Sequence, residues 1–360
     1  MRYLALLILV GAACLAAQPA LGSPAAPVGV DGLSPEDVAK AVSALKENFV
    51  RPAALTDAEM ARATLQGLLD RLAPGVSLVT ATASAGAASP FYSEAYDARS
   101  GYLRLGELSA ANIEKAKQAL KDWSGKGIDA VVLDLRGTPS SSDYDAGADL
   151  ARLFCAKGTE LFSLNAGERE GDSAEVQARN RTFSAEADPL FKGILIVLVD
   201  EETAEAPEAV AACLQKCAKA LVVGDKTAGR AYEYSDVSLA GAVLRVAVAQ
   251  VILPDGKEPG ENGLTPDISV GLGTAGKKEV MRNITTEGVD SVIEEHDRAH
   301  LNEAALVSGS NPEVDELEAE EAGRKPPEPL IDRQLQRALD LVTSISIYQA
   351  KGDAGPKTGE

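Results

Sequence analysis

Only two histidines, His296 and His300, occur in the chain, and their spacing permits one kind of chemistry. Histidines four positions apart on a helix can share one zinc ion, and Asp297 between them resembles the acid of the metal-binding motif HExxH, shortened by one methylene. Glu294 and Glu295 make the segment polar on all sides, and no third ligand can be identified from the sequence. We therefore interpret it as a solvated helix face and predict neither a metal nor a cofactor.

Three cysteines, Cys155, Cys213 and Cys217, remain once Cys14 near the N-terminus is set aside. An odd number excludes a complete disulfide framework. Cys213 and Cys217 would lie on one side of a helix, so a metal or redox pair is one alternative. We favour buried thiols, because the surrounding AVAACLQKCAKAL has the pattern of an ordinary amphipathic helix and cysteine is a frequent core residue.

The first residues have the pattern of a secretory signal peptide over 1–22: Arg2, an apolar run over 3–17, and small residues before Ser23. The apolar run is shorter than the roughly 20 residues that span a bilayer. We expect cleavage, no stable membrane insertion afterwards, and export to the periplasm, the cell envelope or the extracellular space. An uncleaved anchor and a lipidated Cys14 are the alternatives.

The charge balance excludes some partners. Asp and Glu number 54 against 35 Lys and Arg, which gives a formal net charge of −19. A chain this acidic is repelled by phosphate backbones and anionic lipid, so we expect no nucleic-acid binding. The hydrophobic content of 45% is enough for one large core.

The elements that would position any site change in character along the chain. Capping-box starts predict helices over 35–48 and 57–72 in an N-terminal helical lead-in over 35–75, followed by a Gly/Ala/Ser-rich linker over 76–99. Short apolar runs then alternate with helical stretches, which favours an α/β core over 100–275 with a parallel sheet. The runs are 102–105, 129–135, 193–199 and 220–224, the helical stretches 110–123, 143–154 and 204–218, and 242–253 alternates like a half-exposed strand.

The C-terminal part has three further segments. We expect a polar helix within 276–307, mainly over 287–306, then an acidic flexible insertion over 308–329. A final helix over 330–350 has Leu335, Leu339, Val342 and Ile345 on one face, which would pack on the core.

Six segments, taken in order and spacing, resemble the C-terminal processing or tail-specific proteases, serine peptidases that use a Ser/Lys dyad. VVLDLRGTP resembles the family's DLRGNPGG, LVDEETAEAPEAVA its VDxxTASASE, and VVGDKTAGR its VGEKTFGK. The six segments are GYLRLGELS from Gly101, VVLDLRGTP from Val131, LVDEETAEAPEAVA from Leu198, VVGDKTAGR from Val222, LPDGKEPGENGLTPDISV from Leu253 and DRQLQRALDLV from Asp332. The resemblance implies a crotonase/ClpP-like core with a parallel-rich sheet.

The lead-in carries a further similarity, because LKENFVRP from Leu45 is close to the family's ENYVDP element. Many members have a PDZ domain between this lead-in and the core. The linker over 76–99 is far shorter than the roughly 80 to 100 residues that an independent module of that kind needs. We expect the PDZ domain to be absent.

The same resemblance shows that the family's dyad is degenerate here. It places Glu205 at the position of the nucleophilic serine and Arg230 at that of the lysine. The oxyanion turn corresponds to Gly137 through Ser140, with Ser140 in place of a glycine, and Tyr234 stands where the family has a glutamine. No intact catalytic residue is therefore expected.

The replacements disable proton transfer. A guanidinium with a pKa above about 12 cannot act as a general base near neutral pH. A glutamate beside an arginine is a weak base and a poor nucleophile toward an amide. Joint replacement at matched positions suggests a salt bridge between Glu205 and Arg230, with neutral drift of a dead site as the alternative.

Two functions remain open at this stage. The favoured one is a noncatalytic peptide-binding, protein-binding or scaffold protein, since main-chain pairing with an unfolded segment requires no catalytic group. The alternative is a serine-type endopeptidase that cleaves C-terminal regions of envelope proteins with displaced residues, for which Thr203 and Lys226 are the candidates.

Overall fold

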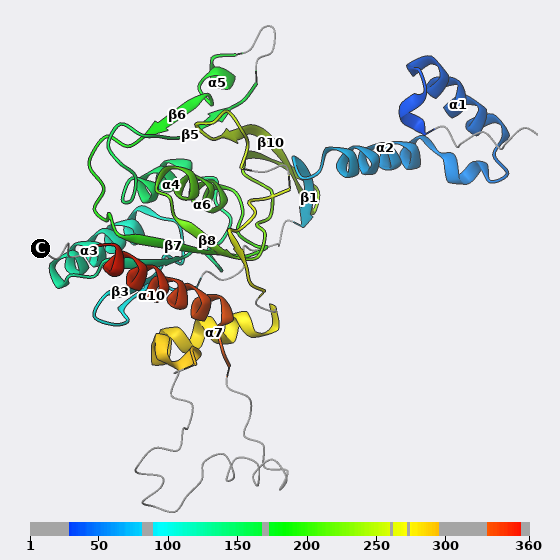
Figure 1. Ribbon diagram of the computed structural model, residues 1–360. Coiled ribbons are helices and arrows are strands. Elements are labelled where there is room, and N and C mark those ends of the chain that lie inside the picture. The colour runs from blue at the N-terminus through cyan, green and yellow to red at the C-terminus, as the bar shows by residue number, and fades with distance from the viewer. Residues whose placement is uncertain are drawn as a thin grey trace, which may run out of the picture. The chain divides into compact units, whose positions relative to one another are not determined.

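The computed structural model describes residues 29–80, 89–167, 173–259, 262–271, 274–294 and 330–353 (Figure 1). The chain divides into two units, Met1–Asp70 and Arg71–Glu360. The predicted signal peptide with Cys14, the two histidines and the predicted insertion over 308–329 lie outside the described residues.

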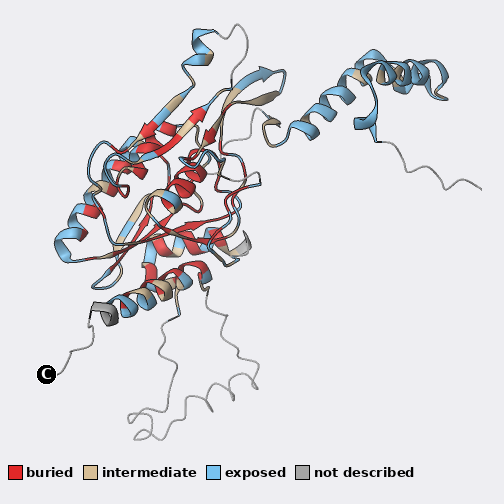
Figure 2. Ribbon diagram, turned by 45° about the horizontal axis from the view of Figure 1, so that its top comes forward, coloured by how far each residue is buried: buried red, intermediate tan, exposed pale blue. Residues whose placement is uncertain are grey.

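The first unit is helical. Helix α1 (Pro35–Asn48) begins after Ser34, whose hydroxyl accepts a hydrogen bond from the N–H of Asp37, as the capping pattern predicts. Helix α2 spans Asp57–Leu72, and the short 3-10 helices η1 (Val30–Gly32) and η2 (Pro52–Leu55) precede and separate the two. Neither α1 nor α2 has a buried residue (Figure 2), so the described core lies entirely in the second unit.

The second unit is built on a six-stranded sheet with the order β11-β8-β7-β4-β3-β2. All neighbouring strands are parallel except the β2/β3 pair, which is antiparallel. The predicted apolar runs form its centre, which confirms an α/β core with a parallel-rich sheet. The strands are β2 (Tyr92–Ala95), β3 (Ser100–Arg104), β4 (Ala130–Asp134), β7 (Ile194–Val199), β8 (Leu221–Gly224) and β11 (Ile268–Ser269).

Helices cover both faces of this sheet, which is why its central strands are apolar throughout. One face packs on α3 (Ala110–Lys126), α4 (Tyr144–Ala151) and α6 (Ala206–Cys217). The other packs on α7 (Thr274–Glu287), η3 (Val289–Val292) and α10 (Arg333–Asp353). Strand residues alternate between the two cores: Val131 and Leu133 face the first, Ala130 and Val132 the second.

A second, antiparallel sheet has the order β1-β10-β5-β6, with β9 also paired to β10. Strand β10 (Ala242–Ile252) is the half-exposed strand that the sequence predicts. The other strands are β1 (Val76–Thr80), β5 (Glu160–Asn165), β6 (Arg181–Ser184) and β9 (Tyr232–Leu239), and a short helix α5 (Ala174–Gln177) precedes β6.

One expectation about a segment needs correction, and another is tested only in part. The stretch 76–99 is not simply a linker, because β1 pairs with β10 and β2 with β3; pairing with distant strands, rather than local periodicity, orders these residues. Within the expected segment 276–307, the described helix is α7, which ends at Glu287, before Gly288 with φ 93°, whereas most of the span 287–306 lies outside the described residues and stays a prediction. Val280, Met281 and Ile284 of α7 are buried, and residues 295–307 lie outside the described part.

The final helix α10 agrees with the prediction, since Leu335, Leu339 and Val342 are buried on the sheet. Among the described residues, no helix combines the length and apolar character needed to cross a bilayer.

Candidate functional site

The sequence-predicted dyad and oxyanion-turn positions follow the carboxyl ends of β4, β7 and β8, whereas Tyr234 lies on β9. Three segments leave the sheet there: 135–141 after β4, 200–205 after β7 and 225–231 after β8. In parallel α/β sheets this edge is the usual location of a ligand site, because loops from neighbouring strands meet there.

Glu205 occupies a strained turn at the start of α6. Its backbone has φ 59° and ψ −129°, a region that a non-glycine residue adopts at a cost of about 1 to 3 kcal/mol. The side chain is 3% exposed. Its carboxylate accepts hydrogen bonds from the Ser142 hydroxyl at 2.9 Å and from Nη1 of Arg245 at 3.0 Å. We call Glu205, Ser142 and Arg245 the closed site.

The predicted salt bridge between Glu205 and Arg230 is wrong. Among the described ion pairs, the partner of Glu205 is Arg245 of β10. The backbone connects the two dyad positions instead, because the Glu205 N–H donates to the carbonyl of Arg230 at 3.1 Å. The Arg230 side chain is exposed and lines a cavity, whereas the Glu205 side chain is buried.

The backbone around Glu205 is also occupied. The N–H of Ala206 donates to the carbonyl of Ser141 at 2.9 Å, and Ser141 and Glu205 form a parallel bridge. In acyl-transfer sites the amide after the nucleophile commonly binds the developing oxyanion. Here that amide is bonded to the protein's own carbonyl, and the turn after β4 contains Gly137, with φ 66°, and the exposed Ser140.

Glu208 is a site residue that sequence reasoning missed. It is fully buried, and its carboxylate accepts hydrogen bonds from the Thr227 hydroxyl and, at 2.8 Å each, from the N–H groups of Gly229 and Arg230. It therefore fixes the turn that carries Arg230. An acid within the apolar run of α6 was the available signal, since buried acids are rare unless paired.

Two tyrosines border the closed site. Tyr144 is fully buried, its hydroxyl has no hydrogen-bond partner among the described residues, and burial together with nearby Glu205 and Glu208 raises its pKa. Burial raises the pKa of Tyr234 to about 12. The Tyr234 hydroxyl donates to the carbonyl of Pro74 at 3.0 Å, and the Arg245 guanidinium lies 4.7 Å from its ring centre.

The displaced candidates have other contacts. Thr203 is 1% exposed, and its hydroxyl donates to Asp200 at 2.9 Å while accepting from the Asp200 N–H at 3.1 Å. These bonds close the turn after β7. Lys226 is exposed in the turn after β8.

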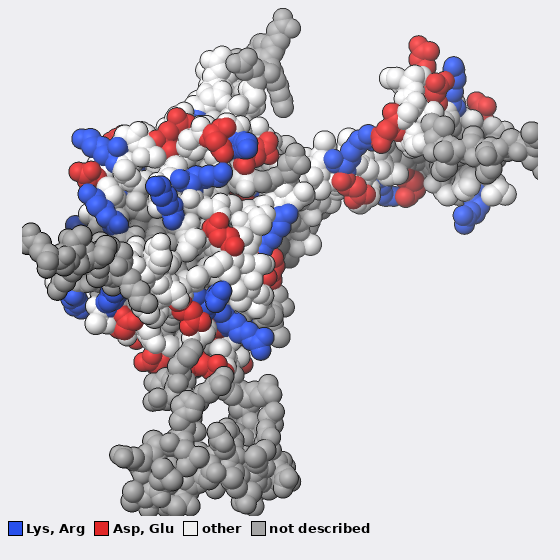
Figure 3. Space-filling model, in the orientation of Figure 1, with Lys and Arg blue, Asp and Glu red and all other residues white. Residues whose placement is uncertain are grey.

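A cavity of about 670 Å³ lies beside the closed site. The turn over 137–140, Arg230 and one face of α7 line it, and Lys277, Lys278 and Arg282 are the basic residues that α7 contributes. Figure 3 shows Lys and Arg side chains gathered over α7. We call this the cationic cavity.

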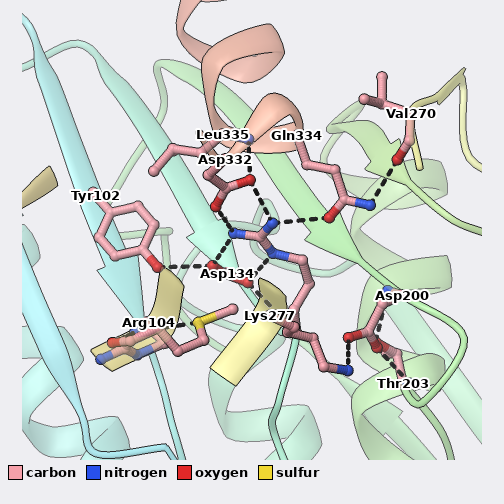
Figure 4. Close-up of polar contacts among 12 residues, drawn as sticks. Tyr102, Arg104, Asp134, Asp200, Thr203, Val270, Lys277, Asp332, Gln334 and Leu335 are labelled. Atoms are coloured by element: carbon pink, nitrogen blue, oxygen red, sulfur yellow. Dashed lines mark hydrogen bonds and ion pairs between the residues drawn. The ribbon is translucent and has the colours of Figure 1, made fainter. Parts of the chain in front are cut away.

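A buried guanidinium holds the turn that borders this cavity (Figure 4). Arg136 donates from Nε and Nη2 to Asp134, from Nη1 and Nη2 to Asp332, and from Nη1 to Gln334, at 2.7 to 2.9 Å. All five N–H groups of the guanidinium are thereby used. Asp332 also caps α10 by accepting from the N–H of Leu335 at 3.0 Å, so the C-terminal helix and the turn after β4 are tied together.

Helix α7 is fixed on the other side of the cavity by two cations. Arg104 donates to the Met281 carbonyl at 2.9 Å and to the Thr285 hydroxyl. Lys277 bonds to Asp200 at 2.6 Å and to Glu202, and these acids raise its pKa against the opposing effect of burial.

The three thiols lie together. Cys155 and Cys213 are buried and Cys217 is half-buried, and all are free. Interaction with the Cys155 and Cys217 thiols, together with burial, raises the pKa of Cys213, and interaction with Cys213 lowers the pKa of Cys217 against the opposing effect of burial. Within the described ranges, no group of three or more His, Cys, Asp or Glu side chains is arranged to hold a metal ion.

Comparison with known proteins gives concordant matches. The profile of peptidase family S41 matches residues 99–270. A carboxyl-terminal-processing protease of Synechocystis sp. is 32% identical over 172 residues, 46% of this chain and 37% of the relative. The carboxy-terminal processing protease CtpA of Bacillus subtilis is 27% identical over 186 residues, 50% of this chain and 37% of the relative.

Among solved structures, the photosystem II D1 C-terminal processing protease is similar with 28% identity and a TM-score of 0.39, covering 54% of this chain and 48% of that one. The chain thus spans less than half the length of these three proteins.

Proposed function

Residues 99–270 form a domain of peptidase family S41, and from this premise we propose that the chain is an exported, noncatalytic member that binds peptides or unfolded protein segments. The observation that carries the proposal is the state of the closed site. Glu205 is buried and bonded to Ser142 and Arg245, and the adjacent Ala206 amide is bonded to Ser141.

Catalysis would require three things that this arrangement lacks. A nucleophile must reach the substrate, but the Glu205 side chain is 3% exposed and its carboxylate is held by two donors. A base must lose its proton near neutral pH, which an arginine at position 230 does not do. A free amide must face the oxyanion, whereas that of Ala206 has a partner.

Binding makes fewer demands. Of the described strands, only β10 pairs with β9, so β9 has one edge without a strand partner. Strand β9 begins at Tyr232, two positions after Arg230, so a peptide added to this edge would lead toward the cationic cavity. Strand addition uses main-chain hydrogen bonds and tolerates many sequences.

An endopeptidase with displaced residues is the alternative. Thr203 is the available hydroxyl near the strand end, but its two bonds to Asp200 already hold the turn and keep it buried. This favours the noncatalytic proposal.

The test combines binding with cleavage. We expect the purified chain to bind a labelled, reduced and alkylated protein and to leave it uncut. The double variant Glu205→Ser with Arg230→Lys should also fail to cleave it, because the Ala206 amide still bonds to Ser141. Cleavage by the unaltered chain would overturn the proposal, and so would failure to bind any unfolded protein.

A further inference from the structure

The cationic cavity carries an excess of positive charge in a chain whose net charge is −19. Arg230, Lys277, Lys278 and Arg282 line it, against one acid, Glu202. Lys277 is neutralised locally by Asp200 and Glu202. The side chains of the other three cations, Arg230, Lys278 and Arg282, are exposed and can contact a ligand.

These three cations are weakly engaged. Arg282 pairs with Glu279 of the same helix at 3.2 Å, but both side chains are more than half exposed, and such pairs contribute little. Arg230 and Lys278 have no side-chain hydrogen bond or ion pair within the described part of the chain. Arg230 is nevertheless well placed, since Glu208 fixes its backbone N–H at 2.8 Å.

We propose that the cationic cavity binds an acidic segment of the bound peptide, with its carboxylates engaged by Arg230, Lys278 and Arg282. This inference rests on the proposed peptide-binding function and specifies its ligand. A guanidinium matches a carboxylate with two parallel hydrogen bonds, and an ammonium adds a point charge.

The cavity suits a peptide better than a small anion. Its volume of about 670 Å³ lies in the usual range of ligand pockets and far exceeds the size of one phosphate. Pro90, Pro139 and Met281 add apolar walls that a peptide's hydrophobic side chains can contact. Strand β9 begins two positions after Arg230, a residue that lines the cavity, and its edge without a strand partner among the described strands gives a main chain a place to pair.

The negative charge of the rest of the molecule repels acidic ligands and so favours their binding at the cationic cavity over other parts of the surface. A chain with a large net negative charge disfavours acidic ligands over most of its surface, so an acidic peptide should find its favourable contacts at this cavity. Binding should weaken as salt rises, because exposed charges are screened within about 8 to 10 Å at ionic strengths near 0.1 M.

The experiment is fluorescence anisotropy with three labelled peptides of equal length and the same apolar residues. One carries Asp and Glu, one carries Asn and Gln, and one carries Lys. We expect the full chain to bind the acidic peptide at least about tenfold more tightly than the amide peptide, and the basic peptide least. Arg230→Ala and Lys278→Ala should each weaken acidic binding about fivefold and weaken amide binding by a smaller factor.

Lys121→Ala is the matched control, an exposed lysine on α3 that should change neither affinity. Equal binding of the acidic and amide peptides would overturn this inference while leaving the proposed function standing. Binding of none of the three would overturn both. Tight binding of inorganic phosphate alone, with no preference for the acidic peptide, would assign the cavity to a small anion and also overturn the inference.

Discussion

The closed site and the cationic cavity lie at the same edge of one sheet but use charge in opposite ways. In the closed site, Glu205 is buried and every charged contact comes from the protein itself. In the cavity, Arg230 and Lys278 are exposed, and their side chains form no hydrogen bond or ion pair with the described residues. A buried charge must be paired by the fold, whereas an exposed one is available to a ligand. The contrast is what the proposed function rests on: a carboxylate used within the fold beside cations that are open to a ligand.

Two arginines near this edge show the same difference. Arg136 is fully buried and uses all five guanidinium N–H groups within the fold. Arg230 is exposed, and only its backbone is bonded. The first therefore contributes to stability, whereas the side chain of the second is open to the proposed peptide.

The largest effect should follow from breaking the Arg136 cluster. Asp332→Ala leaves two of the five N–H groups of a buried guanidinium without their acceptor and removes the cap of α10, so we expect the free energy of unfolding to fall by about 3 to 5 kcal/mol. Urea unfolding measures this. Arg337→Ala, an exposed position on the same helix, should change it by less than about 0.5 kcal/mol. A loss below about 1 kcal/mol for Asp332→Ala would show that the cluster is not structural.

Alkaline pH tests the buried tyrosines. Burial is the largest cause that raises the pKa of both Tyr102 and Tyr144 above the usual value near 10. The folded state thus keeps protons that the unfolded state loses, so stability is intact below pH 10 and falls as pH rises above it. We expect more than about 1 kcal/mol lost per pH unit.

Chemical unfolding at pH 9, 10 and 11 measures that loss. Tyrosinate absorbance of the folded protein should lag behind that of the unfolded protein. Equal stability at pH 9 and 11 would contradict the burial of these hydroxyls.

The backbone strain at Glu205 predicts that a glycine at this position gives a more stable protein than an alanine does. Both Glu205→Gly and Glu205→Ala remove the ion pair, but glycine adopts φ 59° without strain. We expect the glycine variant to be more stable than the alanine variant by about 1 kcal/mol in urea unfolding, the reverse of the usual order near a helix. An alanine variant that is the more stable would show that the turn relaxes once the carboxylate is lost.

The smallest effect concerns Tyr144. Its buried hydroxyl has no partner among the described residues, so Tyr144→Phe removes an unsatisfied polar group and keeps the ring packed on Phe162. Stability should stay constant or rise by up to about 1 kcal/mol. Differential scanning calorimetry measures the change in stability. A loss above about 1 kcal/mol would indicate that the Tyr144 hydroxyl makes a stabilising hydrogen bond.

The local sequence pattern predicted the helices and strands better than it predicted which strands pair and which side chains meet. The apolar runs of β4, β7 and β8 and the caps of α1 and α2 are determined within a few residues of sequence, so they could be predicted from it. Strand β1 could not be predicted from its local sequence, because its strand conformation depends on pairing with β10, far along the chain. The prediction of the ion-pair partner of Glu205 was wrong for the same reason, since Arg245 lies 40 positions away on a strand of the other sheet.

The most direct test of lost chemistry with retained binding is native mass spectrometry of the full chain after prolonged incubation with the acidic peptide. The account predicts a one-to-one complex in which the peptide has its intact mass, and no fragments in solution. Peptide fragments that appear with the unaltered chain, and not with buffer alone, would contradict it.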